Sequence, residues 1–134
     1  MAKASCNCGQ LSVVVVGEPV RVSVCHCYAC QKRTGSAFGV QARYPLSAVT
    51  FNGSSRAYQR IGDDGGKIKF KFCPDCGSTL WFTMNVMSDV VAIPLGNFAG
   101  ENGSDFSLPT PNTSVYQTRC HDWVRLDGID DVYD

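Results

Sequence analysis

The eight cysteines of this 134-residue chain, and their spacing, constrain its fold more than any other feature. Cys120 stands alone, whereas the other seven fall in three short groups: Cys6-x-Cys8, Cys25-x-Cys27-x-x-Cys30 and Cys73-x-x-Cys76. Cysteines one or two residues apart direct their sulfurs toward one point in space, which suits the tetrahedral coordination of Zn²⁺. The spacing therefore predicts zinc sites that tie distant parts of the chain together.

Disulfide bonds are the main alternative use of an even number of cysteines, and they belong chiefly to small secreted domains. Residues 1–6 hold one basic residue and none of the apolar segment that a signal peptide has, so we expect a cytoplasmic, reducing environment. A thioredoxin-like role for Cys27-x-x-Cys30 is also disfavoured, because no βαβ pattern surrounds the motif. Zinc is the better explanation of the thiols.

The composition of the chain indicates a single domain and argues against nucleic-acid and membrane partners. Hydrophobic residues make up 44% of the chain and charged residues 18%, which suits one domain with an apolar core. Twelve Lys and Arg residues balance twelve Asp and Glu residues, so nothing attracts a phosphate backbone and we expect no nucleic-acid partner. The longest apolar run, Val13–Val16, is too short to span a bilayer, and we expect no membrane partner. The sequence leaves the oligomeric state open.

Apolar residues alternate with polar ones along most of the chain, which is the period of a β-strand. The predicted strands are Leu11–Val16, Val20–Val24, Phe38–Tyr44, Val49–Phe51, Ala57–Arg60, Lys67–Phe72, Thr79–Met84 and Val90–Pro94, with Val115–Arg119 and Trp123–Leu126 completing the set. One short helix is predicted from Tyr28 to about Thr34. The alternating lysines of Lys67–Phe72 indicate a solvated strand face. Large aromatic residues are expected in the core or in a pocket wall: Phe38, Tyr44, Trp81, Phe82 and Trp123.

The segment Phe72-Cys73-Pro74-Asp75-Cys76-Gly77 has the form of a zinc knuckle. Proline sets the turn, and glycine lets backbone N–H groups approach the thiolates. A knuckle needs two further ligands, and Cys6-x-Cys8 can supply them in a closed, structural site. Pairing Cys27 and Cys30 with the knuckle satisfies four-coordination equally well, so spacing alone leaves the pairing open.

With the first pairing, Cys25, Cys27 and Cys30 remain, and three protein ligands with one open position are typical of catalytic zinc. Three thiolates make the metal a weak Lewis acid, better suited to activating another thiol than to activating water, although hydrolysis stays an option. In the alternative case, Cys120 or His121 supplies a fourth ligand, and the second zinc site is closed like the first. The protein would then be a non-catalytic, zinc-stabilised module that binds a ligand or another protein.

Together the motifs resemble those of the glutathione-dependent formaldehyde-activating enzyme family, also called the GFA or CENP-V/GFA domain. The residues that carry the resemblance are Cys6-x-Cys8-Gly9, Cys25-His26-Cys27-x-x-Cys30, Arg33–Phe38 and Phe72-Cys73-Pro74-x-Cys76-Gly77. The resemblance implies a single zinc domain over residues 4–127, followed by a C-terminal tail at 128–134. Its implied fold is mainly β, a β-tent of small antiparallel sheets tied by zinc sites, with one short helical turn.

The resemblance also implies one structural and one catalytic zinc ion. Cys6, Cys8, Cys73 and Cys76 would hold the structural ion, and Cys25, Cys27 and Cys30 the catalytic one. The implied activity is that of a zinc-dependent carbon–sulfur lyase or transferase, which joins formaldehyde to glutathione and gives S-hydroxymethylglutathione.

Glutathione carries two carboxylates, so a glutathione site calls for cations near the metal. Arg33 is the predicted substrate-binding cation, and Arg43 can reach the site from a neighbouring strand, whereas Arg56 is expected to be a solvated surface charge. The chain departs from the family pattern at Gly96-Asn97-Phe98-Ala99 and in a long loop, Gly100–Pro111. These differences leave the identity of the substrate open.

Overall fold

The computed structural model describes all 134 residues, and they form eleven strands, one α-helix and three short 3-10 helices. The strands are β1 (Ala2–Ser5), β2 (Ser12–Val15), β3 (Arg21–Cys25), β4 (Gly39–Pro45), β5 (Val49–Asn52), β6 (Arg56–Ile61), β7 (Lys67–Phe72), β8 (Thr79–Met84), β9 (Met87–Pro94), β10 (Thr113–Val115) and β11 (Asp131–Val132). The helices are α1 (Tyr28–Thr34), η1 (Leu46–Ala48), η2 (Leu95–Phe98) and η3 (Gln117–Arg119).

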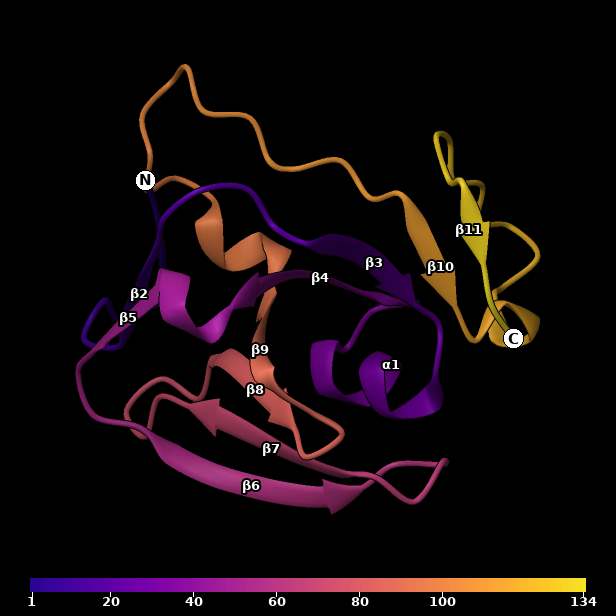
Figure 1. Ribbon diagram of the computed structural model, residues 1–134, viewed down its shortest axis with the longest axis horizontal. Helices are drawn as coiled ribbons and strands as arrows, with labels where there is room; N and C mark the ends of the chain where they lie inside the picture. Colours follow the sequence, from indigo (N-terminus) through magenta and orange to yellow (C-terminus); the bar gives the residue numbers. More distant parts are fainter.

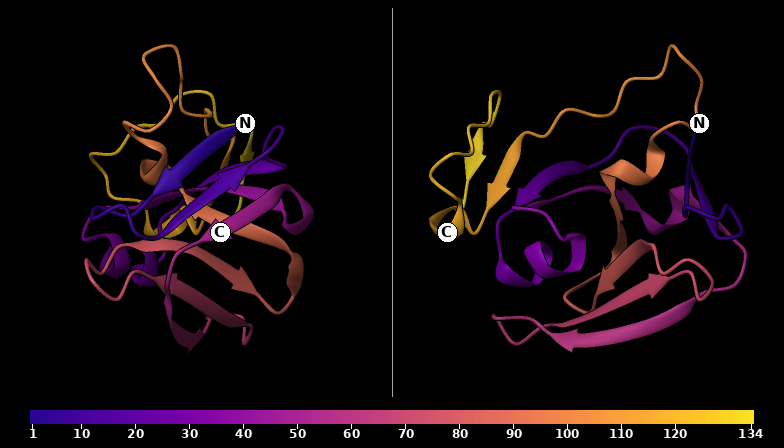
Figure 2. Two further views of the ribbon diagram at one scale, coloured as in Figure 1. Left: turned by 90° about the vertical axis from the view of Figure 1, so that its left-hand side faces the viewer. Right: turned by 180° about the vertical axis from the view of Figure 1, so that it is seen from behind.

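The strands form two sheets of unequal size (Figure 1). The smaller sheet has the order β1-β2-β5 and is antiparallel, and the larger has the order β11-β10-β3-β4-β9-β8-β7-β6. Within the larger sheet, β10 runs parallel to both β3 and β11, whereas the other pairs are antiparallel. In Figures 1 and 2, α1 lies between β3 and β4 on one side and β6 and β7 on the other.

Side chains on β3 and β4 alternate between two environments, as the pleat of a strand requires. Val22, Ala42 and Tyr44 belong to the main core. Their neighbours Cys25 and Gln41 line a cavity next to α1 instead. The same two strands therefore support the core with one face and a candidate site with the other.

The main core comprises 15 buried residues from both sheets. Leu11, Val13 and Val15, beside and within β2, pack with residues of β4, β8 and β9. Cys6 and Cys73 belong to the same cluster, so the first candidate metal site forms part of the core boundary. A smaller cluster of Phe70, Phe82 and Ala92 packs separately, on β7, β8 and β9.

An extended segment over residues 99–112 links η2 to β10 and runs along the outside of the domain (Figures 1 and 2). Asn102 fixes its first part, because its side chain accepts from the Lys3 amide at 2.7 Å and donates to the Lys3 carbonyl at 2.9 Å. Phe106 packs against the core with its ring 6.3 Å from that of Phe98. Contacts to β1 and η2 thus hold the long loop near its start.

The mainly β architecture and the single short helix confirm the prediction from sequence. The helix spans Tyr28–Thr34 and ends at Gly35, whose φ of 67° is the left-handed conformation that glycine adopts easily. On β7, Lys67 and Lys69 are exposed and Phe70 is buried, which confirms the predicted solvated face.

Two predicted strands and one predicted core residue are wrong. In the segment Val115–Arg119 only Val115 is extended, because Tyr116 has a φ of 54° and leads the chain into η3. Over Trp123–Leu126 there is no strand, and a hydrogen bond from Val124 N to His121 O closes a turn instead. Trp123 is 73% exposed and stacks on His121 rather than on the core.

Two strands have no counterpart in the prediction, β1 and β11. The sequence of β1, Ala-Lys-Ala-Ser, lacks β-branched residues, and its strand form depends on pairing with β2. Strand β11 lies within residues 128–134 and pairs with β10. The domain limits of 4–127 stay a prediction. No helix of the structure combines the length and the apolar character needed to cross a membrane.

Candidate metal centres and the adjoining cavity

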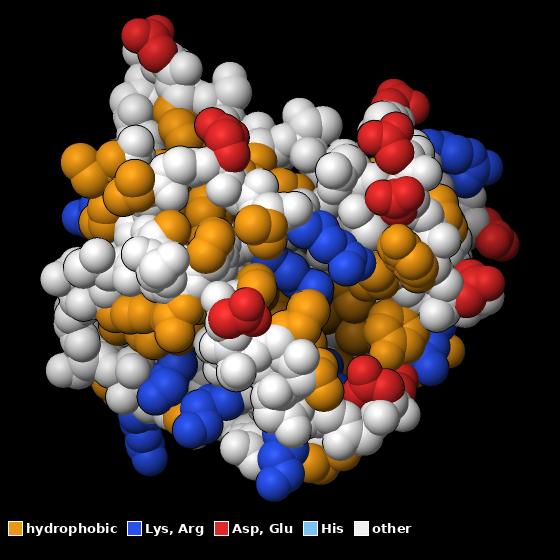
Figure 3. All heavy atoms as spheres, in the orientation of Figure 1, with side chains coloured by type: hydrophobic (Ala, Val, Ile, Leu, Met, Phe, Trp, Pro, Cys, Tyr) orange, Lys and Arg blue, Asp and Glu red, His pale blue; other side chains and the backbone are white.

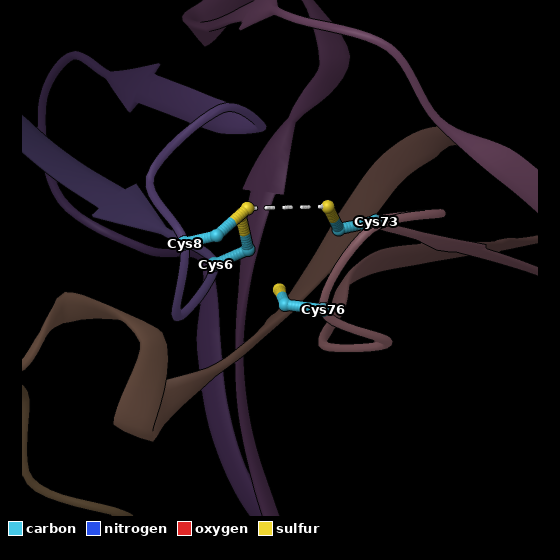
Figure 4. Close-up of side chains that lie close together, drawn as sticks. All are labelled: Cys6, Cys8, Cys73 and Cys76. Carbon is cyan, nitrogen blue, oxygen red and sulfur yellow. Dashed lines mark hydrogen bonds between the residues drawn. The ribbon is translucent and has the colours of Figure 1, made fainter.

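The first candidate metal centre brings together four sulfurs from two connections, β1–β2 and β7–β8, that are far apart in sequence (Figure 4). Sγ of Cys8 lies 3.6 Å from Sγ of Cys6 and 3.6 Å from Sγ of Cys73, and all four sulfurs, with Cys76, lie within 4.8 Å of one another. A tetrahedral zinc ion with Zn–S bonds of about 2.3 Å holds its sulfurs about 3.8 Å apart. The spacing and the four-thiol donor set therefore fit zinc.

Local backbone structure directs these sulfurs inward. Gly77, with a φ of 80°, closes the knuckle by donating to the Cys73 carbonyl at 2.9 Å. Cys73 Sγ accepts from the Gln10 side chain at 2.9 Å and from the Asp75 amide at 3.4 Å. The Ser78 hydroxyl, 3.4 Å from Cys76 Sγ, helps to lower the pKa of Cys76 to about 5. Hydrogen bonds of this kind favour the thiolate, which is the form that binds metal.

The second candidate metal centre is a group of three buried cysteines, Cys25, Cys27 and Cys30, whose sulfurs lie within 4.8 Å of one another. Cys25 is the last residue of β3, Cys27 is the N-cap of α1, and Cys30 lies in the first turn of that helix. The Cys30 amide donates to Cys27 Sγ at 3.3 Å. Hydrogen bonds from the Cys25 and Cys30 thiols lower the pKa of Cys27, whereas the pKa values of Cys25 and Cys30 are raised, so the trio favours a single thiolate on Cys27.

Cys120 and His121 do not belong to the three-cysteine group. His121 Nε2 lies 2.8 Å from Gln31 Oε1, and the Cys120 thiol contacts the His121 carbonyl at 3.6 Å. His26 is fully buried between the ligands, with Nε2 3.1 Å from the Ser114 hydroxyl. Burial lowers the pKa of His26, and nearby His121 adds to the effect. Neither histidine joins the sulfurs.

A cavity of about 300 Å³ adjoins the three-cysteine group and is lined by all three cysteines. Figure 3 shows this face hollowed near its middle, with hydrophobic atoms inside the hollow and basic atoms at its edge. Ile68, Phe70, Phe82 and Met84 contribute to an apolar wall from β7 and β8. None of the four cysteines of the first centre lines this cavity or the two more open depressions beside Arg33. The second centre therefore has room beside it for a small molecule.

The aromatic and charged residues on one side of the cavity form a connected group. The Arg119 guanidinium lies 4.5 Å from the centre of the Tyr28 ring and 5.0 Å from that of Tyr116. It also donates to Asp63 Oδ2 at 2.8 Å, which joins η3 to the turn between β6 and β7. Tyr116, the single non-glycine residue with positive φ, packs against the cysteine trio, and burial raises its phenol pKa.

Arg33, the predicted substrate-binding cation, does not line the cavity of the three cysteines. Its guanidinium lies over the Phe82 ring at 5.4 Å, and its side chain borders two shallower depressions. Arg56 is exposed on β6 and also lies outside the cavity, whereas Arg43 lines it. The prediction singled out neither Arg60 nor Gln41, which line the cavity as well. Strand alternation with Arg43 was an available signal for Gln41.

Comparison with known proteins gives a family and a fold. The family model described as "Glutathione-dependent formaldehyde-activating enzyme" matches residues 1–119. No curated protein matches the chain. The crystal structure of a Rhodobacter sphaeroides protein superposes with a TM-score of 0.57 at 21% identity, covering 77% of this chain and 93% of that one, a likeness in fold alone. Since the family model spans most of the sequence, the chain belongs to the glutathione-dependent formaldehyde-activating enzyme family.

Proposed function

We propose that this protein is a zinc enzyme that activates a small thiol at Cys25, Cys27 and Cys30 and makes or breaks a carbon–sulfur bond. The observation that carries the proposal is the contrast between the two cysteine groups. The trio lines a cavity of about 300 Å³, whereas none of the four cysteines of the other group lines that cavity or the two more open depressions beside Arg33. We assign a structural zinc to Cys6, Cys8, Cys73 and Cys76 on this ground, and a reactive zinc to the trio.

Zinc held by three thiolates supplies a position at which a further thiol loses its proton and becomes a nucleophile. The residues that line the cavity determine the environment of this thiol. The apolar wall formed by Phe70, Phe82 and neighbouring residues keeps water away from one side of the cavity. Tyr116, with its raised phenol pKa, stays protonated at neutral pH and can donate a hydrogen bond to an oxygen that gains charge.

The substrate pair suggested by the family is glutathione and formaldehyde. In the forward direction the thiolate sulfur attacks the aldehyde carbon, a carbon–sulfur bond forms, and the carbonyl oxygen takes up one proton to give S-hydroxymethylglutathione. The protein contributes by holding both reactants together and by lowering the proton affinity of the thiol. Arg33 stays a predicted contact for glutathione.

The test begins with zinc per chain on freshly purified protein, measured with and without glutathione. We expect two zinc ions, one of which responds to the thiol in its occupancy. The rate of S-hydroxymethylglutathione formation, followed by NMR, should exceed the uncatalysed rate, and Cys25→Ser should abolish the excess. Cys120→Ser is the matched control, because Cys120 belongs to neither group. Two tightly held ions that ignore glutathione, with no rate excess, would instead support a non-catalytic binding module.

A further inference from the structure

A row of buried polar atoms without partners runs along β3 and β4, on the face turned away from the core. Ser23 lies opposite Gln41 in the register of these strands, and Arg21 lies opposite Arg43. Ser23 Oγ, Gln41 Oε1 and the Nε atoms of both arginines are buried and have no hydrogen-bond partner. Buried polar groups are normally paired, so a row of four unpaired atoms calls for an explanation. Its position points to a ligand.

The row begins at the cysteine trio, because Cys25 follows Ser23 two residues later on the same face of β3. Gln41 and Arg43 both line the cavity that the trio lines. Gln41 is only 2% exposed, so its side-chain amide has little access to bulk solvent. Along β4, Gln41 lies nearer to the level of Cys25 than Arg43 does. A ligand that extends from the trio along β4 would therefore meet the Gln41 amide before the Arg43 guanidinium.

Arg43 carries a positive charge that no protein carboxylate neutralises. The structure holds one salt bridge, Arg119–Asp63, and gives the Arg43 side chain no hydrogen bond. Burial lowers the pKa of Arg43, Arg21 adds to this effect, and the Cys25 and Cys30 thiols oppose it. Arg60, the other cation of the cavity without a carboxylate partner, lies over the Phe70 ring at 5.6 Å. An incoming anion would therefore meet unpaired cations beside the trio.

We propose that Gln41 and Arg43 form an anion subsite that selects thiols carrying a carboxylate, with the sulfur at the cysteine trio and the carboxylate on Arg43. The inference rests on the proposed function and names the class of thiol that the same cavity takes. A guanidinium binds a carboxylate through charge-assisted hydrogen bonds, and exclusion of water strengthens them. The unpaired amide of Gln41 provides a further polar contact for the part of the ligand between sulfur and carboxylate.

A competing role for Arg43 is to offset the negative charge of the thiolates themselves. That role would influence the binding of every thiol equally, because it acts through the metal centre. A carboxylate subsite instead influences only ligands that carry the anion. The two roles are therefore separable with ligands that share a thiol and differ in charge.

The experiment is calorimetric titration of the zinc-loaded protein with 3-mercaptopropionate and with its neutral isostere, 3-mercaptopropionamide. A hydrogen bond to a charged group contributes enough to predict a preference of about tenfold or more for the acid. Arg43→Gln should reduce this preference to about one. Arg56→Gln, a change to an exposed arginine outside the cavity, should leave it unchanged.

Equal affinity of the wild-type protein for the acid and the amide would overturn the inference, as would equal weakening of both by Arg43→Gln. The wild-type comparison stands even where a variant fails to fold. 3-(Methylthio)propionate, which has the carboxylate but no thiol, separates the two proposals. If 3-mercaptopropionate binds no more tightly than this thioether, and Arg43→Gln weakens both of these acids alike, the thiol contributes nothing, so the proposed function fails and the anion subsite stands. If no ligand binds, both fail.

Discussion

The two cysteine groups should differ in how much they stabilise the fold, and Cys73→Ser and Cys25→Ser form a matched pair for measuring the difference. Each variant replaces one buried thiol with a hydroxyl of similar size. A bound metal stabilises a protein only as far as it prefers the folded chain to the unfolded one. An unfolded chain keeps Cys25, Cys27 and Cys30 within six residues and can still gather them around a metal.

The four ligands of the other group are not close together in sequence, so an unfolded chain cannot gather them as easily. Cys8 and Cys73 are 65 residues apart, and closing a loop of that length costs the unfolded chain about 3.7 kcal/mol. Closing the five-residue span from Cys25 to Cys30 costs about 1.4 kcal/mol on the same scale. Loss of the four-cysteine site should therefore lower the free energy of unfolding by about 2 kcal/mol more than loss of the trio.

For a chain of 134 residues this difference corresponds to about 8 °C in Tm. The assay is thermal unfolding followed by circular dichroism, with zinc per chain measured on the same samples. Cys73→Ser should lose one zinc ion and unfold at the lower temperature, and Cys25→Ser should lose one and stay closer to the wild type. Equal drops in Tm, with one ion lost from each variant, would refute the reasoning from chain closure.

Three further predictions concern the core, the side of the cavity and a buried histidine. Phe98→Ala removes a ring that is 1% exposed, and should cost about 3–5 kcal/mol of stability in denaturant titration; a loss below about 1 kcal/mol would contradict the core position. Asp63→Asn breaks the partly exposed ion pair with Arg119, so Tm should hardly change while the KM for the thiol shifts; an unchanged KM would show that the ion pair does not influence binding. Burial lowers the pKa of His26, so the unfolded state binds more protons and stability falls as pH drops below about 6.5; His26→Gln should reduce that slope.

The cysteine groups were predictable because their chemistry is local. The spacing of Cys73 and Cys76 around Pro74 fixes a turn whatever the rest of the chain does. The pairing of this knuckle with Cys6 and Cys8 was not fixed by spacing, because the β1–β2 connection and the start of the β7–β8 connection meet only in the folded chain. The spacing of residues along the sequence does not show which connections come into contact in the folded chain.

The arginines near the cavity illustrate a different limit of sequence-based prediction. Arg33 follows the trio closely in sequence, yet its guanidinium lies over the Phe82 ring and its side chain does not line the cavity. Arg43 is remote in sequence and reaches the cavity through strand pairing, since β4 lies beside β3. Nearness along the chain singled out Arg33, which stays a prediction, whereas alternation along a strand places Gln41 and Arg43 together on the cavity face.

The predicted strand over Val115–Arg119 was wrong for a conformational reason. Val115, Tyr116 and Thr118 are residue types that are common in strands, but Tyr116 adopts a left-handed backbone that ends β10 after three residues. The turn places Arg119 between Tyr28 and Tyr116. The residue types of a segment indicate its preferred structure, but they do not show that one residue is held in a rare backbone conformation by its tertiary surroundings.

The parallel pairing of β10 with β3 sets an order of assembly for the site. Val115 accepts a hydrogen bond from the His26 amide at 3.1 Å, and Val115, Tyr116 and Arg119 line the cavity beside cysteines some 90 positions earlier. During synthesis the ribosome releases all four ligands of the first centre before it releases β10. A nascent chain can therefore complete its structural cluster while its reactive thiols still lack one wall, and the cavity closes only when the last third docks.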